Sequence, residues 1–332
     1  MDQHPHDHDH PAPEGFADRL RGLFSHDHEH GPPLADTGAE GIRASKVSLA
    51  GLGITALLQG VVVVSTGSVA LLSDTIHNLT DALTAIPLWI AFALGRRASS
   101  KRFTFGLGRA EDLAGLIIVL AIAVSAGGVA WESIRRLLDP RALDHIPWVI
   151  AAGFIGATGN ELVAEYRIHV GRRISSEALV ADGHHARADA LTSLAVVAAG
   201  IGAALGADWM DPVAGLIVAA MILILLKNSA ARVFGRLLDA VDPEHVDHVK
   251  EIASQVGGVK SVGEVRMRWH GHRMLITLTA AVDTELPVRD GHRIAQEITH
   301  QLIHGFPFKT EALVHIDPSD AEDAHDLTEH HL

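Results

Sequence analysis

Six apolar stretches constrain this chain more than any other feature of its sequence. Each has roughly 15–27 residues, about the length with which an α-helix crosses the hydrocarbon layer of a membrane. They cover residues 47–64, 69–94, 113–130, 146–164, 179–205 and 212–226. One such stretch can be a core helix of a soluble protein, but six with short connections leave little room for a soluble fold. A mean hydropathy of +0.21 agrees with this, and the sequence therefore predicts a membrane-embedded bundle of six helices.

The basic residues predict how the bundle lies in the membrane. If the amino terminus is inside, the inner flanks hold Arg43, Lys46, Arg96, Arg97, Lys101, Arg102, Arg109, Arg167, Arg172, Arg173, Lys227, Arg232 and Arg236. The outer turns hold Arg135, Arg136 and Arg141. By the positive-inside rule, we expect a multi-pass protein of the cell (inner) membrane with both termini cytoplasmic. The run ESIRR at 132–136 is a local exception that charge counting does not explain. The pair Asp211-Pro212 predicts a helix start, with Asp211 as the cap.

Cysteine and net charge exclude several classes of protein. The chain has no cysteine, which excludes disulfides, thiolate zinc sites, iron–sulfur clusters and cysteine nucleophiles. The net charge of −13 lies mostly in the two ends, because residues 46–318 carry 24 basic and 26 acidic residues. A body this close to neutral predicts no binding to nucleic acid, since phosphate contacts need a concentrated basic surface.

Both ends of the chain are rich in histidine and acid. The first 45 residues lack the basic start and apolar core of a signal peptide, which favours a cytoplasmic amino terminus. HPHDHDH (4–10) and HDHEH (26–30) alternate imidazole with carboxylate, and His325, His330 and His331 lie in the acidic carboxyl end. Such tracts can capture divalent metal loosely without folding, and the alternative is a solvated tail without that role.

Two of the apolar stretches contain the same polar pattern, D-x2-H-x3-D. It occurs in SDTIHNLTDALT (73–84) and in ADGHHARADALT (181–192), at a constant offset of 108. Residues at i, i+3 and i+7 share one face of a helix, so each copy forms a polar stripe. The first stripe is Asp74, His77 and Asp81, and the second is Asp182, His185 and Asp189. Ionisable groups cost roughly 2.5–3.5 kcal/mol each in lipid on insertion scales, so we expect the stripes to face each other or water.

Opposed stripes would make a metal site. His77, Asp81, His185 and Asp189 supply two imidazole nitrogens and two carboxylate oxygens, a tetrahedral set that suits Zn²⁺ first and cobalt, iron or cadmium next. Ca²⁺ and Mg²⁺ prefer oxygen shells. Asp74 and Asp182 could support the ligands, line an access path or bind the ion directly. The alternative is that all six are hydrogen-bonding residues of a helix interface, while the neighbouring His184 points about 100° away from the stripe.

These motifs resemble the cation diffusion facilitator family. The resemblance covers about residues 45–318 and rests on HNLTD in the second stretch, HARAD in the fifth and TFGLGRAE at 104–111. It implies a homodimeric transporter that exports a cytoplasmic divalent metal, most often zinc, in exchange for protons by alternating access. It also implies that His77, Asp81, His185 and Asp189 bind the ion. A further metal site that some members have between their second and third helices is not expected, because residues 95–112 contain no histidine.

The composition after the sixth stretch is that of a soluble domain. The residue pattern predicts the order α-β-β-α-β, with a helix at 242–256, two strands around His270-Gly271-His272, a second helix and a last strand, ALVHIDP. The family resemblance implies a ferredoxin-like cytoplasmic domain that dimerises and binds regulatory metal through His292, His315 and Asp317. The chain has Gly263 or Glu264 where some members have a further histidine.

These observations define four parts and one mechanism. We expect a tail at 1–44, a transmembrane domain at 45–230, a metal-sensing and dimerisation domain at 235–318 and a second tail at 319–332. Zinc binds neutral imidazole and ionised carboxylate, so metal and protons compete for the same ligands. No enzymatic activity is expected, since the chain has no H-E-x-x-H string for an intramembrane metalloprotease. A membrane-bound protein that stores metal without transporting it is the alternative from another class.

Overall fold

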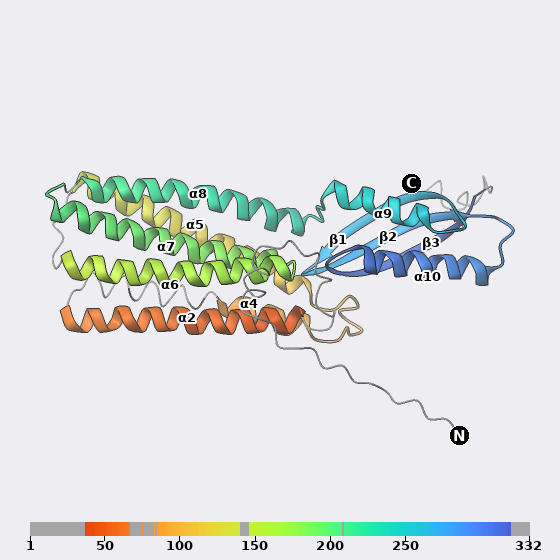
Figure 1. The fold of residues 1–332 in the computed structure, drawn as a ribbon, viewed down its shortest axis with the longest axis horizontal. Coiled ribbons are helices and arrows are strands. Elements are labelled where there is room, and N and C mark those ends of the chain that lie inside the picture. Colours follow the sequence, from red (N-terminus) through yellow and green to blue (C-terminus); the bar gives the residue numbers. More distant parts are fainter. Residues whose placement is uncertain are drawn as a thin grey trace, which may run out of the picture. The chain divides into compact units, whose positions relative to one another are not determined.

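The computed structural model describes residues 37–66, 75, 83, 85–139, 146–207 and 209–319. Figure 1 shows the helices and strands within these ranges. The first part contains α2 (Thr37–Thr66), α4 (Ala85–Gly95), α5 (Arg109–Leu138), α6 (Ile146–Arg173), α7 (Glu177–Ala204) and α8 (Met210–Leu237). The second contains α9 (Pro243–Gln255), β1 (Val259–His270), β2 (Arg273–Val282), α10 (Val288–Gly305) and β3 (Lys309–Pro318).

The membrane bundle predicted from the apolar stretches is confirmed. Within the described residues, five helices, α2, α5, α6, α7 and α8, are long and apolar enough to cross a membrane. Of the second predicted span, 69–94, the structure describes residues 75 and 83 and the final part, which forms α4. The remainder of this span lies outside the described residues. The helices also run past the apolar stretches; α2 begins at Thr37 and α6 continues to Arg173. Hydropathy marks only the part of a helix that lies in lipid, whereas the backbone hydrogen bonds continue beyond it.

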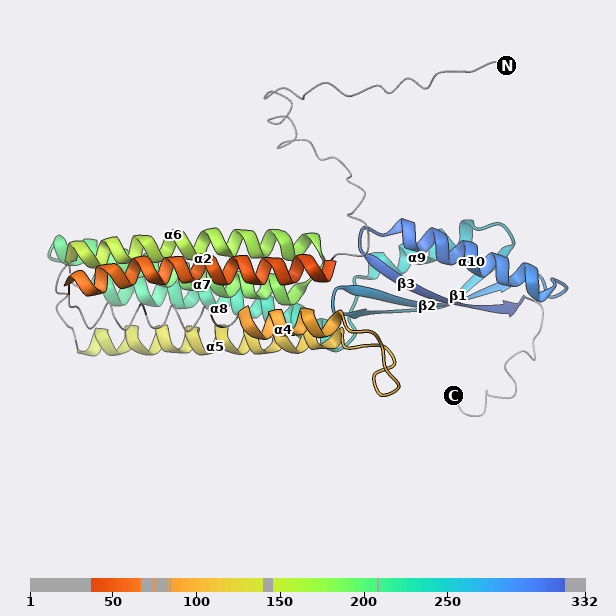
Figure 2. The ribbon, with the colours of Figure 1, turned by 90° about the horizontal axis from the view of Figure 1, so that it is seen from below.

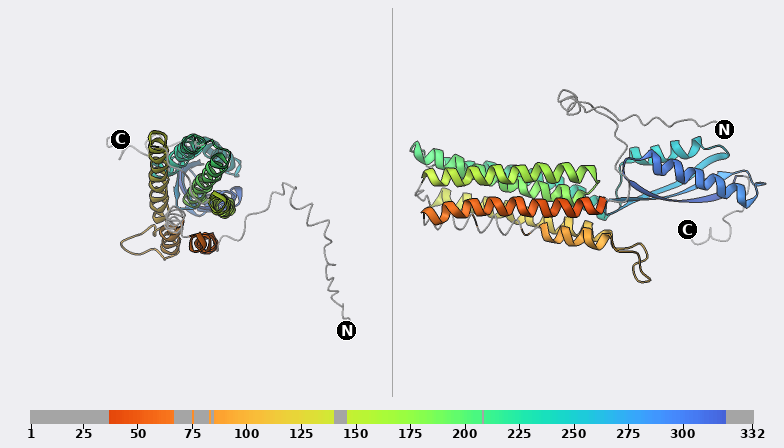
Figure 3. Two further views of the ribbon diagram at one scale, coloured as in Figure 1. Left: turned by 90° about the vertical axis from the view of Figure 1, so that its left-hand side faces the viewer. Right: turned by 60° about the horizontal axis from the view of Figure 1, so that its bottom comes forward.

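The helices of the bundle pack as neighbouring pairs. Helix α6 lies along α7 and α5 along α8, while α2 packs on α6 and α7 contacts α8 (Figures 1 and 2). Helix α4 packs against both α2 and α5 (Figure 3). The largest fully buried apolar side chains of the bundle are Leu88, Phe92, Ile118, Ile122, Leu179 and Ile222. Other large apolar side chains, such as Leu57, Val124 and Leu162, are exposed on the helices, as expected for a surface that meets lipid.

An ion pair between α5 and α8 involves Arg136 of the exceptional run at 132–136. Arg136 donates from Nη1 to the two carboxylate oxygens of Asp211, at 3.1 and 2.8 Å, and from Nε to Glu132 at 3.1 Å. The prediction that Asp211 caps a helix is wrong, because α8 begins at Met210 and Asp211 lies in its first turn. Arg136 is therefore paired locally with acids, which charge counting along the sequence does not detect.

The carboxyl-terminal domain has the predicted order α-β-β-α-β. Strand β1 pairs antiparallel with β2, and β2 pairs parallel with β3, so β2 is the central strand. Side chains of β2 alternate between the core and the other face, as the period of a strand requires. Helices α9 and α10 pack on the sheet and on each other, and the core contains Val249, Met274, Ile276, Leu278, Ile298 and Leu302. The domain is a small two-layer α+β fold with a hydrophobic core of its own.

Candidate metal site and the contact between the domains

The polar stripe predicted on the fifth stretch is buried in the bundle. Asp182, His185 and Asp189 all lie on α7, with relative exposures of 0%, 1% and 5%. The His185 Nδ1 lies 4.0 Å from Oδ1 of Asp189, one helical turn further along. An imidazole and a carboxylate at this spacing on one buried face can both bind one ion. The neighbouring His184 is directed elsewhere, since its Nδ1 lies 2.8 Å from the Ser229 hydroxyl on α8.

The matching stripe, Asp74, His77 and Asp81, lies outside the described residues. Among the residues that the structure describes, no group of three or more histidine, aspartate and glutamate side chains could hold a metal ion. The four-ligand site His77, Asp81, His185 and Asp189 therefore stays a prediction, of which the structure describes the α7 half.

The structure places an arginine beside the α7 stripe that sequence reasoning assigned to a basic flank. Arg167, on α6, is 1% exposed, and its Nη1 lies 3.1 Å from Oδ2 of Asp182. The same nitrogen donates to the backbone oxygen of Asp182 at 3.3 Å. The Arg167 side chain is buried between α6 and α7, which counting it as a flanking charge does not predict. The only sequence signal for this ion pair is the polar stripe on α7. Using that signal requires knowing that α6 packs against α7.

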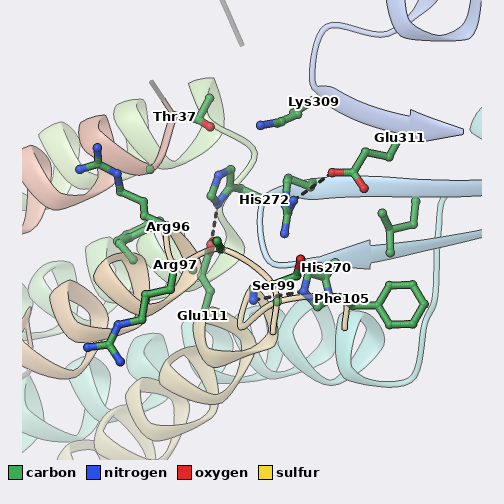
Figure 4. Close-up of a pocket in the computed structure, with 18 of the residues that line it drawn as sticks. Thr37, Arg96, Arg97, Ser99, Phe105, Glu111, His270, His272, Lys309 and Glu311 are labelled. Carbon is green, nitrogen blue, oxygen red and sulfur yellow. Dashed lines mark hydrogen bonds and ion pairs between the residues drawn. The ribbon is translucent and has the colours of Figure 1, made fainter. Parts of the chain in front are cut away.

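The turn between β1 and β2 contacts the bundle where α5 begins. His270 accepts a hydrogen bond at Nε2 from the backbone N–H of Gly108 (3.1 Å), and His272 donates from Nδ1 to Oε2 of Glu111 (2.8 Å). Figure 4 shows both histidines pointing toward the start of α5. Gly271 between them has a φ of +62°, the left-handed conformation that favours glycine. The two histidines that the sequence places in a turn thus connect the domains.

Arg236 at the end of α8 holds the same turn from another side. It donates from Nη1 to the backbone oxygens of Ser175 (2.8 Å) and Gly271 (3.1 Å). Its guanidinium carbon also lies 4.1 Å from the centre of the Trp269 ring. The side chain therefore ties the turn before α7, the end of α8 and the β1–β2 turn together.

A polar cavity of about 580 Å³ lies beside this contact. Charged residues from the bundle and the carboxyl-terminal domain line it, namely Arg96, Arg97, Glu111, Arg273, Lys309 and Glu311, together with His270 and His272 (Figure 4). Arg273 pairs with Glu311 at 2.9 Å. Burial lowers the pKa of His270 below its ordinary value, and the nearby cations Arg273 and Arg109 lower it further. This lowered pKa favours the neutral ring, which is the form that can accept the hydrogen bond from Gly108.

The predicted regulatory residues are only partly brought together. His315 and Asp317 lie two positions apart on β3, and His315 Nε2 is 2.9 Å from Oδ1 of Asp317. His292 is exposed on α10. Within the described part of one chain, these three residues do not form a group that could hold a metal ion. The histidine-rich segments 1–36 and 320–332 lie outside the described residues.

The fold and the buried stripe define a class of protein: a multi-pass membrane protein with ionisable residues inside the bundle and a small α+β domain after it. Two family models match the chain. The cation efflux transmembrane domain matches residues 45–238, and the cytoplasmic domain of cation efflux proteins matches residues 241–319. The chain belongs to the cation diffusion facilitator family, and its class is that of divalent metal cation efflux transporters.

Similarity to individual proteins agrees with this assignment. A probable cation efflux system protein of Mycobacterium tuberculosis (strain H37Rv) is 48% identical over 94% of this chain and 96% of its own length. The manganese efflux system protein MneP of Bacillus subtilis is 26% identical over 76% of this chain and 87% of its own. Metal tolerance protein C1 of Arabidopsis thaliana is 25% identical over 90% of this chain and 67% of its own length.

Proposed function

We propose that this protein exports a divalent transition metal, zinc first, in exchange for protons. The observation that carries the proposal is the buried pair His185 and Asp189 on α7, in a sequence pattern that the second apolar stretch repeats. Buried ionisable side chains in a membrane bundle are costly and are kept where an ion or a proton needs them. In the proposed site, His77 and Asp81 join His185 and Asp189 around one ion.

Proton exchange follows from the chemistry of these ligands. Metal binds the neutral imidazole and the ionised carboxylate, so loading the site displaces protons and protonation releases the metal. Alternating access would let the site load from the cytoplasm and release on the other side, where a lower pH favours protonation. No covalent step is needed.

Nitrogen ligands favour zinc, cobalt, iron and cadmium over manganese. The similarity to a relative named as a manganese efflux protein makes manganese the ion to compare with zinc. Storage without transport is the alternative from another class, and flux measurements separate the two.

We further propose that the protein acts as a homodimer with both termini in the cytoplasm. Dimerisation would involve the carboxyl-terminal domain, as the family model of that domain supports. Two copies of the exposed His315, together with Asp317 and His292, could complete a regulatory site across the dimer that one chain does not form. The histidine-rich tails would capture metal near the mouth of the transport path.

The test is metal uptake by the full-length protein in sealed vesicles. Zn²⁺, Mn²⁺, Co²⁺, Fe²⁺ and Cd²⁺ are presented one at a time, with and without a pH gradient. We expect Zn²⁺ to move fastest and its rate to rise when the opposite compartment is acidic. Binding of metal without flux would contradict the proposal and support storage, and faster Mn²⁺ than Zn²⁺ flux would contradict the choice of zinc.

A further inference from the structure

Arg167 and Asp182 form a buried ion pair between α6 and α7. Their side chains are 1% and 0% exposed, and the Nη1 to Oδ2 distance is 3.1 Å. Nη1 also donates to the backbone oxygen of Asp182 at 3.3 Å, so one nitrogen contacts both the side chain and the main chain of the same residue. This double contact places the guanidinium beside the Asp182 carboxylate.

Two glycines let the helices approach closely enough to bury the pair. A Cβ on Gly183 would lie 3.0 Å from the backbone nitrogen of Ile168 and 3.1 Å from the oxygen of Ala164. A Cβ on Gly171 would lie 2.9 Å from the backbone nitrogen of Val180. Small residues that bring backbones together are typical of helix packing in membranes. The pair is thus held in a tight crossing of α6 and α7.

The pair adjoins the proposed metal ligands. Asp182 lies three residues before His185 and seven before Asp189, a spacing that puts the three on one face of α7, and all three are buried. Residues three apart on a helix are neighbours, with Cβ atoms about 5–6 Å apart. A net charge at Asp182 would therefore act strongly on a divalent ion bound by His185, because the site is shielded from water. The arginine cancels that charge.

We propose that Arg167 is a positioning residue for transport: it holds the Asp182 carboxylate in a fixed, neutral ion pair, so that Asp182 is not a metal ligand. This inference rests on the proposed function and adds a role that the ligand set does not include. A neutral pair next to the site keeps the metal bound weakly enough to be released in each cycle. A free carboxylate there would hold the ion, and a free guanidinium would repel it.

The test is a double-mutant cycle at the two positions. KM and kcat are measured for Zn²⁺ uptake and, in parallel, for Mn²⁺ uptake by full-length protein in vesicles at pH 8. Asp182→Asn leaves the arginine uncompensated and should raise KM about tenfold or more. Arg167→Met leaves the carboxylate uncompensated and should lower KM and kcat together. The double variant Arg167→Met with Asp182→Asn should return KM to within about threefold of the unmutated protein.

The double variant separates this role from direct metal binding. If Asp182 were a ligand, its loss would raise KM whether or not Arg167 is present, and the double variant would stay as weak as Asp182→Asn. That result would overturn the inference. Arg173→Met is the matched control, since Arg173 lies on the same helix, is about half exposed and pairs with Glu40 at 2.9 Å. Its KM should not change.

Loss of one partner of a buried pair can prevent folding, so two variants keep the test decisive. The double variant has no buried charge at these positions, and Arg167→Lys keeps the charge. If the Asp182→Asn and Arg167→Met single variants do not assemble, the inference predicts a nearly unchanged KM for Zn²⁺ uptake in the double variant and in Arg167→Lys. A change in KM above about fivefold in either of these two overturns the inference. Absence of flux in the unmutated protein would instead refute the proposed function, which distinguishes the two failures.

Discussion

His272 donates a hydrogen bond of 2.8 Å from Nδ1 to Oε2 of Glu111, and so joins the β1–β2 turn to the first turn of α5. The two residues are 161 positions apart in the chain. Glu111 is 3% exposed, and its Oε1 makes no hydrogen bond with the described residues. A carboxylate buried this deeply depends on the histidine, so the contact between the carboxyl-terminal domain and the bundle is specific rather than a loose approach of two surfaces.

Gly271→Ala should weaken this contact. Gly271 has a φ of +62°, and a Cβ there would lie 2.8 Å from the backbone oxygen of Gly108. Backbone strain of this kind costs about 1–3 kcal/mol, so we expect the melting temperature of the full chain to fall by several degrees. Gly257→Ala is the control, because a Cβ at Gly257 meets nothing within 4 Å. Equal melting temperatures for the two variants would refute the tight fit described here.

The contact should weaken at acidic pH through His270. Its pKa is lowered from the ordinary value of 6.5 by burial and by Arg273, Arg109 and Arg268, against an opposing effect of Glu311. A group with a lowered pKa stabilises the docked state in its neutral form, so this stability is complete above pH 6.5 and is lost as the pH falls below it. Hydrogen exchange of residues 268–275 should therefore accelerate below pH 6.5. His270→Gln should remove most of this pH dependence, and an unchanged profile would contradict the assignment.

The sequence was sufficient to predict the bundle and the smaller domain because both follow from patterns along the chain. Apolar length marks five described spans, and the alternation in MLITLTAAV marks β2. The Asp182, His185 and Asp189 stripe follows from helical periodicity alone, and the structure shows that all three side chains are buried. Such features depend on residues that are near in sequence.

Contacts between distant elements could not be predicted in the same way. Arg167 has the composition of a membrane flank, and only the close crossing of α6 and α7 shows that it pairs with Asp182. Likewise, Arg136 looked like a misplaced outer charge until α8 brought Asp211 beside it. In both cases the contact depends on which helices are neighbours, and the hydropathy pattern does not contain that information.

Loss of His315 and Asp317 should remove a zinc response of the carboxyl-terminal domain. The experiment compares thermal melts with and without Zn²⁺, in full-length protein whose transport site is weakened by Asp189→Asn. A ligand at 100 times its Kd stabilises by about 2.7 kcal/mol, so a shift of several degrees is expected from the remaining site. Adding His315→Ala and Asp317→Ala should abolish the shift.

The control for this melt is His300→Ala with His304→Ala, an exposed ring pair on α10. These substitutions should leave the zinc shift in place. A protein whose melting temperature ignores zinc before His315 and Asp317 are changed would have no regulatory site of this kind, and the domain would serve dimerisation alone.

Deleting residues 1–36, which end just before α2, should affect transport only at scarce metal. HPHDHDH and HDHEH offer seven histidines that can raise the local metal concentration, and both tracts precede α2, which begins at Thr37. We expect the half-saturating Zn²⁺ concentration to rise about two- to tenfold, with an unchanged maximal rate in vesicles. Loss of all transport from a deletion variant that still inserts would show that the segment has a structural role.

The central claim is that His185 and Asp189 bind the transported ion and exchange it for protons. The most direct measurement records Zn²⁺ uptake and internal pH together in vesicles that contain the full-length protein, Asp189→Asn or the control Ser193→Ala. Ser193 is buried one turn further along the same face and is not a proposed ligand. We predict that Asp189→Asn reduces both the zinc and the proton flux at least about a hundredfold, while Ser193→Ala keeps both. Zinc flux in Asp189→Asn near that of the unmutated protein, with its proton flux intact, would contradict the claim.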